Sequence, residues 1–158
     1  MKVGITGHQK LNDPSAWSDV CKQLGELLND AEKPLIGLTS LAIGADQLFA
    51  EVVLGCGGRI EAIIPFDGYD LKFTEGPDRE AFRRLLEQAA RVETLEKQGT
   101  DEDAYLAAGK RIVDLCDRMI AVWDGQPAAG IGGTGDIVTY CKSQDKPVDL
   151  IPIDASSR

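Results

Sequence analysis

The sequence contains few of the residues that build metal sites, disulfide frameworks or membrane anchors. Its 158 residues include one histidine, His8, and four cysteines with no Cys-x-x-Cys pair. Because zinc sites and disulfide frameworks need such residues in clusters, we expect no metal ion and interpret the cysteines as buried, free thiols. No apolar run approaches the roughly 20 residues of a membrane-spanning helix, and the first residues lack the features of a signal peptide. The chain is therefore predicted to be cytoplasmic, with no membrane partner.

Basic residues are also in the minority. Lys and Arg together number 17 against 26 Asp and Glu, which gives a formal net charge of −9. Non-specific binding of nucleic acid relies on Lys and Arg side chains that neutralise phosphates. The acidic balance therefore predicts that nucleic acid is not a partner. The hydrophobic share of 43% and the length suit a compact domain, so we expect residues 1–158 to form a single domain.

Apolar, strand-like runs alternate with segments of helical periodicity along the chain. The predicted strands are Lys2–Thr6, Pro34–Thr39, Arg59–Ile64, Arg91–Leu95, Arg118–Trp123 and Pro147–Ile153. The helix after the first strand is predicted to have Asp13 as N-cap and Pro14 as its first residue, and Thr100 with Asp103 forms a predicted capping box. This alternation indicates an α/β fold: a single Rossmann-like, doubly wound domain with a mostly parallel sheet flanked by helices.

Small and polar residues follow several of the predicted strands. In doubly wound sheets, ligands bind beyond the carboxyl ends of the strands, near the point where the strand order reverses. The first strand leads into Thr6-Gly7-His8, the second into Ser40–Asp46, and the strand Arg118–Trp123 into Asp124-Gly125 and a glycine-rich loop. The predicted ligand-binding residues are Thr6, Gly7, His8, Ser40, Gly44, Ala45, Asp46, Asp124, Gly125, Gly132, Gly133, Thr134, Gly135 and Asp136.

The glycine-rich loop Gly132–Gly135 is the predicted phosphate site. Glycines let backbone amides approach an anion, and the start of a helix adds partial positive charge. The hydroxyl of Thr134 is an extra donor, and the ribose is expected at Asp124 or Asp46. His8 either donates to the phosphate, acts as an acid or base, or is a loop residue bonded to backbone. The alternative for the glycines is that they only form tight turns and helix caps.

Three glycines of this region, Gly130, Gly132 and Gly135, match the dinucleotide fingerprint G-x-G-x-x-G. That fingerprint begins at the end of the first strand of a βαβ unit, with an acid about 20 residues further on. Here six residues separate Trp123 from Gly130, and the acid at that distance, Asp149, falls within the last predicted strand. The sequence therefore argues against a hydride-transferring dehydrogenase. We expect no cofactor.

Together these segments resemble the SLOG superfamily of Rossmann-like nucleotide-binding proteins, which includes the LOG (lysine decarboxylase-like) phosphoribohydrolases and the DprA-like proteins. The resemblance extends from the first strand to the last. It is carried by Thr6-Gly7-His8, Ser40…Gly44-Ala45-Asp46, Ile120–Gly125 and Gly132–Asp136. It implies that the glycine-rich loops bind a nucleotide or a nucleotide-derived small molecule, which in some members is a signal. LOG-type relatives form dimers, so the resemblance also implies a homodimer.

The chain departs from the enzymes of this group at one position. LOG enzymes carry P-G-G-x-G-T-x-x-E, whose glutamate takes part in cleaving the N-glycosidic bond of a nucleoside monophosphate; Thr139 stands at that place here. Thr cannot stabilise an oxocarbenium-like transition state as a carboxylate can. Asp136 or Asp46 is the candidate catalytic carboxylate if the chain is an N-glycoside hydrolase or transferase. Whether it is an enzyme or only binds its ligand stays open at this point.

Overall fold

The computed structural model describes residues 1–11, 13–128, 131 and 133–154, and these build an α/β fold around one sheet. The six strands are β1 (Lys2–Gly7), β2 (Ile36–Thr39), β3 (Arg59–Ile64), β4 (Arg91–Thr94), β5 (Arg118–Trp123) and β6 (Val148–Pro152). They lie in the order β4-β3-β2-β1-β5-β6, and all five pairings are parallel. The predicted Rossmann-like, doubly wound fold is confirmed.

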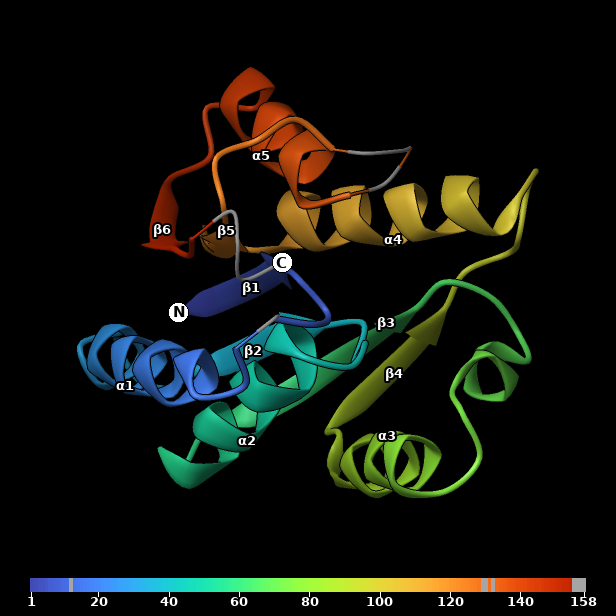
Figure 1. The fold of residues 1–158 in the computed structure, drawn as a ribbon, viewed down its shortest axis with the longest axis horizontal. Helices are drawn as coiled ribbons and strands as arrows, with labels where there is room; N and C mark the ends of the chain where they lie inside the picture. Colours follow the sequence, from blue (N-terminus) through green and yellow to red (C-terminus); the bar gives the residue numbers. More distant parts are fainter. Residues whose placement is uncertain (12, 129–130, 132, 155–158) are drawn as a thin grey trace.

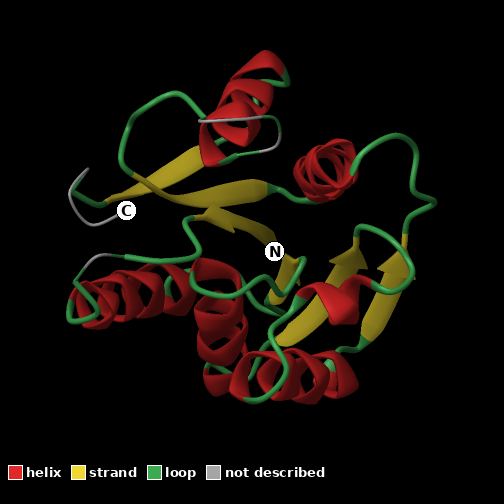
Figure 2. Cartoon of the chain, turned by 45° about the vertical axis from the view of Figure 1, so that its right-hand side comes forward, coloured by secondary structure: helices red, strands yellow, loops and turns green. Residues whose placement is uncertain are grey.

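Helices cover both faces of the sheet (Figure 2). They are α1 (Ala16–Asn29), α2 (Ala45–Gly55), α3 (Pro77–Gln88), α4 (Asp101–Leu115) and α5 (Thr134–Ser143). In Figure 1, α1, α2 and α3 lie below the sheet, and α4 and α5 lie above it. Among the described residues, none of the helices has the length and apolar character that a membrane crossing requires.

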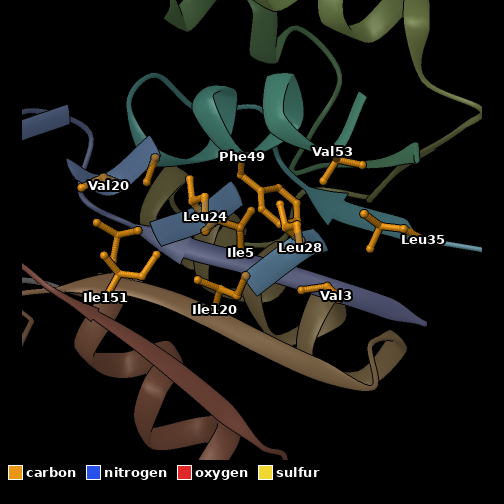
Figure 3. Packing of buried hydrophobic residues seen from close by; sticks show 12 residues of the cluster. Val3, Ile5, Val20, Leu24, Leu28, Leu35, Phe49, Val53, Ile120 and Ile151 are labelled. Atoms are coloured by element: carbon orange, nitrogen blue, oxygen red, sulfur yellow. The ribbon is translucent and has the colours of Figure 1, made fainter. Parts of the chain in front are cut away.

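Alternate residues of the central strands pack against the two helical layers. On the α1/α2 face, Val3 and Ile5 of β1 join Leu24 and Phe49 in a buried cluster (Figure 3). On the other face, Gly4 leaves room for α4, because a Cβ there would lie 2.5 Å from Ile112 Cγ2. The buried strands therefore hold helices closely on both sides, as their continuous apolar runs indicate.

Two of the four cysteines are less buried than predicted. Cys116 and Cys141 are buried in the core, whereas Cys21 and Cys56 are only partly buried. Cys56 directly follows the last residue of α2, and its Sγ lies 3.3 Å from Asn29 Oδ1. Its position at a helix end, between Gly55 and Gly57, explains why it is only partly buried.

The helix starts differ from expectation at one place. Helix α1 begins at Ala16, so the prediction of Asp13 as N-cap and Pro14 as first residue is wrong. The Asp13 carboxylate instead accepts hydrogen bonds from the amide and hydroxyl of Ser15, at 3.0 and 2.7 Å, which closes a turn ahead of the helix. The capping box at the start of α4 is confirmed, with Thr100 and Asp103 bonded to each other's amides.

The segment between β3 and α3 is more ordered than its polar sequence indicates. A short 3₁₀ helix, η1 (Tyr69–Lys72), interrupts it, and Phe66, Tyr69 and Phe73 are buried. The Tyr69 ring meets those of Phe66 and Phe73 edge-on, with centroid distances of 5.8 and 5.2 Å. Three buried aromatic side chains therefore anchor this segment, and it lies beside α4.

Candidate functional site

The strand order reverses between β1 and β5, because β1 pairs with β2 on one side and β5 on the other. At the carboxyl end of the sheet, this reversal opens a cleft of about 610 Å³. Thr6, Gly7 and His8 line it from the end of β1, and Ser40 and Asp46 line it from the loop after β2 and the start of α2. The structure therefore brings these five predicted residues together where doubly wound folds bind ligands.

The N-terminal end of α5 forms a second wall of the cleft. Gly133, Thr134 and Gly135 line it. The first hydrogen bonds of the helix run from Asp136 N and Ile137 N to Gly133 O, at 3.1 and 3.3 Å. The amides of Thr134 and Gly135 precede this ladder, and they carry the partial positive charge of a helix start. This wall thus has the chemistry of an anion site.

His8 is held at the reversal point by both of its backbone polar groups. Its amide donates to Val122 O at 3.3 Å, and its carbonyl accepts from Ala45 N at 3.1 Å. The imidazole Nε2 lies 3.6 Å from Asp124 Oδ1, and the side chains of His8 and Asp124 are 19% and 1% exposed. Asp124 is not a lining residue of the cleft, so this contact joins His8, which lines the cleft, to a carboxylate outside the lining.

Asp46 lies in the first turn of α2, and its carboxyl group is buried at the edge of the cleft. Burial raises the pKa of this carboxyl from 3.8 to about 7, against the opposing effect of hydrogen bonds from the amides of Ala42 and Ser40 and the hydroxyl of Thr39. The carboxyl group therefore exchanges a proton near neutral pH. This is the range in which a carboxyl group can act as an acid or a base.

The predicted residues Gly44 and Ala45 lie outside the cleft lining. Gly44 has a φ of +83°, and a Cβ on it would lie 2.3 Å from Gln9 O. Only glycine combines this backbone conformation with such a close approach. Gly44 and Ala45 therefore hold the loop after β1 against the start of α2, through the Gln9 backbone and the His8 carbonyl.

Two other predicted residues also lie outside the lining. Gly125 and Asp136 are not among the lining residues, and Gly132 lies outside the residues that the structure describes. Thr139, at the place of the LOG glutamate, is exposed, and its hydroxyl donates to Gly135 O at 3.0 Å. Of the two candidate catalytic carboxylates, only Asp46 faces the cleft.

The cleft extends further than the sequence indicated. Beyond β3 its lining continues with Lys72 and Thr74 of the segment before α3 and with Tyr105 and Gly109 of α4. Tyr105, Gly109 and Ile112 all line the cleft at i, i+4 and i+7, which is the spacing of one helix face. That spacing was the available signal, but it equally fits a face packed on the sheet.

The charge of the cleft differs from that of the whole chain. The charged lining residues within the described part are Lys10, Lys72, Asp46 and Asp78, against a net charge of −9 overall. Lys72 Nζ lies 2.7 Å from Asp101 Oδ2. The described residues include no cluster of His, Cys, Asp and Glu that would hold a metal ion. The charged side chains of the described lining are thus two basic and two acidic, in contrast to the acidic excess of the whole chain.

Comparison with solved structures supports the fold assignment. DNA processing protein A from Helicobacter pylori matches with a TM-score of 0.67 at 18% identity, over 99% of this chain and 67% of that one. The same protein from Streptococcus pneumoniae matches with 0.67 at 18% identity, over 98% and 51%. A molybdenum cofactor binding protein from Rippkaea orientalis matches with 0.62 at 18% identity, over 97% and 77%. The chain thus spans about half of the S. pneumoniae protein.

No protein-family model and no curated protein sequence matches the chain. The resemblance to the SLOG superfamily, which includes DprA-like proteins, is confirmed at the level of the fold. The exclusion of nucleic acid is wrong, because the H. pylori protein, which has this fold, is described by its single-stranded DNA binding mode. The net charge of a chain averages over its whole surface and does not report the field at one site.

Proposed function

We propose that the cleft binds a nucleotide or a nucleotide-derived small molecule. The phosphate of this ligand lies on Gly133–Gly135 at the start of α5, and its ribose lies near Asp46, the one of the two acids expected to meet the ribose that lines the cleft. The observation that carries the proposal is the meeting of the α5 amides with Thr6–His8 in one cleft at the strand-order reversal. Helix starts and strand-order reversals are the recurrent phosphate and nucleotide sites of α/β folds.

A matched pair of substitutions at Gly133 tests the phosphate position. Gly133 is the N-cap of α5 in extended conformation, with φ −72° and ψ 172°. Asp and Asn both suit an N-cap, so Gly133→Asp and Gly133→Asn are expected to fold alike. The Asp carboxylate repels a phosphate, and we expect Gly133→Asp to bind AMP about 30-fold more weakly than Gly133→Asn. Isothermal titration calorimetry measures both affinities.

The same titration includes NAD and a single-stranded oligonucleotide as further ligands. The proposal predicts that Gly133→Asp weakens whichever phosphate-bearing ligand the wild-type chain binds in the cleft. Equal affinities of the two variants for that ligand would place the phosphate elsewhere. The wild-type affinities also decide between a small nucleotide and a nucleic acid strand as the preferred ligand.

Hydrolysis of an N-glycosidic bond is the second candidate function, and the position of Asp46 favours it. Its buried carboxyl group, with a pKa of about 7, faces the cleft. In this reaction a carboxylic acid protonates the leaving base while water adds to the sugar carbon, which yields free base and ribose phosphate. Incubation with AMP should then release adenine, as measured by chromatography, and Asp46→Asn should release none. If the wild-type chain releases no adenine, hydrolysis is refuted and ligand binding is the remaining function.

We propose that residues 1–158 act as a single nucleotide-binding domain in the cytoplasm and that two copies form a homodimer. The resemblance to LOG-type proteins supports the homodimer, and the composition supports the cytoplasmic location.

A further inference from the structure

A cluster of aromatic rings lines one end of the cleft, although only 6% of the residues in the chain are aromatic. Phe66, Tyr69, Phe73, Phe82 and Tyr105 form this cluster through a series of ring contacts. Tyr69, Phe73 and Tyr105 line the cleft. Tyr69 and Phe73 are 6% and 7% exposed, whereas Tyr105 is only partly buried. Tyr105 is therefore the ring of the cluster that offers accessible surface to a ligand.

The surroundings of Tyr105 hold its ring in place. It lies in the second turn of α4, just after the capping box that fixes the first turn. Its ring centroid is 6.0 Å from that of Phe66 and 6.2 Å from that of Tyr69. Asp101, one turn earlier, pairs with both Lys72 and Lys97 and so ties α4 to the neighbouring segments. A ring that is already fixed loses little conformational entropy when a ligand contacts it.

The packing of α4 on α5 brings this ring and the phosphate site to one cleft. The two helices meet at Gly109, where a Cβ would lie 2.4 Å from Ile137 Cδ1. Tyr105 precedes Gly109 by about 6 Å along α4, and Thr134 precedes Ile137 by about 4.5 Å along α5. Tyr105 and the α5 amides thus lie on the N-terminal side of this contact in their helices, and both line the cleft.

We propose that Tyr105 stacks on the base of the bound nucleotide, with the sugar between the ring and the α5 amides. The inference rests on the proposed function, which supplies the phosphate position. The inference requires a ligand that carries an intact planar base. Because every base has a π face, stacking on Tyr105 favours nucleotides over sugar phosphates without selecting among bases.

Among the described lining residues, Trp123 is the other partly buried aromatic side chain, and it lies near the start of α5. Its indole Nε1 donates to Gln126 O at 2.8 Å. That carbonyl lies 3.1 Å from the position of a Cβ on Gly135, so Trp123 belongs to the α5 end of the cleft. A base on Trp123 would place the ligand in the reverse direction, and the test includes this arrangement.

The test compares AMP with ribose 5-phosphate, which lacks the base. We expect Tyr105→Leu to lower the affinity for AMP by about 10-fold to 100-fold and to leave the affinity for ribose 5-phosphate unchanged. Tyr105→Phe, which keeps the ring, should bind both ligands like the wild-type chain. Tyr140→Leu is the matched control, because Tyr140 lies outside the cleft lining and its hydroxyl donates to Asp114 Oδ1 at 2.7 Å. Calorimetry gives all affinities.

A measurement on the wild-type chain covers the case in which Tyr105→Leu fails to fold. The ring protons of Tyr105 should shift in NMR spectra on addition of AMP and stay unchanged with ribose 5-phosphate. If both ligands bind and Tyr105→Leu weakens both equally, the stacking on Tyr105 is refuted and the phosphate site stands. If only Trp123→Leu weakens AMP, the stacking on Tyr105 and the phosphate position at the start of α5 are both refuted, while nucleotide binding in the cleft stands. If the wild-type chain binds neither ligand, the proposed function fails as well.

Discussion

Replacing Gly44 by alanine is expected to lower the free energy of unfolding by about 3 kcal/mol or more. The φ of +83° at this position is strained for any residue with a Cβ, and the added Cβ would lie 2.3 Å from the Gln9 carbonyl oxygen. Because this neighbour is backbone, relief requires a shift of the loop after β1, which carries His8. Urea unfolding followed by circular dichroism measures the effect.

The matched control for this substitution is Gly25→Ala. Gly25 lies in the middle of α1, where a Cβ meets no atom within 4 Å. Alanine in a helix interior is favoured over glycine, so this variant should gain roughly 0.5–1 kcal/mol. If Gly44→Ala is as stable as Gly25→Ala, the close approach between Gly44 and Gln9 does not exist.

The second large effect is a pH-dependent gain in stability when Asp46 is replaced by asparagine. The folded chain raises the pKa of this carboxyl from 3.8 to about 7 by burying it. Between these values the folded state keeps a proton that the unfolded state has released, so the stability of the wild-type chain falls as pH rises through this window. Asparagine stays neutral, and its amide oxygen still accepts from the Ala42 amide.

We therefore expect the stability of Asp46→Asn, relative to wild type, to increase by roughly 3 kcal/mol from pH 5 to pH 8. Urea unfolding at each pH unit measures the difference. Asp103→Asn is the control, because capping-box hydrogen bonds lower the pKa of Asp103 and its titration lies below this range. Parallel pH profiles for Asp46→Asn and the wild-type chain would show that the Asp46 carboxyl is ionised throughout.

The strands of this fold are predictable because burial on both faces leaves a local mark. The apolar runs Arg59–Ile64 and Arg118–Trp123 have the same bounds in sequence and structure. Polar residues, Gly and Pro interrupt these runs where the strands end. The strand order itself depends on how the connections between strands cross the sheet. No local pattern in the sequence records these crossings.

The candidate site was predictable where it depends on strand ends and helix starts. Thr6–His8 and Gly133–Gly135 share one cleft because parallel strands end at the same edge. The role of Gly44 was not predictable, since it depends on contact with Gln9, 35 residues away in the sequence. Tyr105 was missed for the same reason: its ring reaches the cleft only through the packing of α4 beside the Phe66–Phe73 segment.

The central claim, a nucleotide with its phosphate at the start of α5, is tested most directly by titrating the isotope-labelled chain with AMP in NMR experiments. Phosphate binding changes the environment of the amides that contact it. The account predicts saturable shifts of the Thr134 and Gly135 amides, together with those of Gly7 and His8, that fit one dissociation constant. Saturable shifts confined to residues outside the cleft, or unchanged amides at Thr134 and Gly135 at saturating AMP, would contradict it.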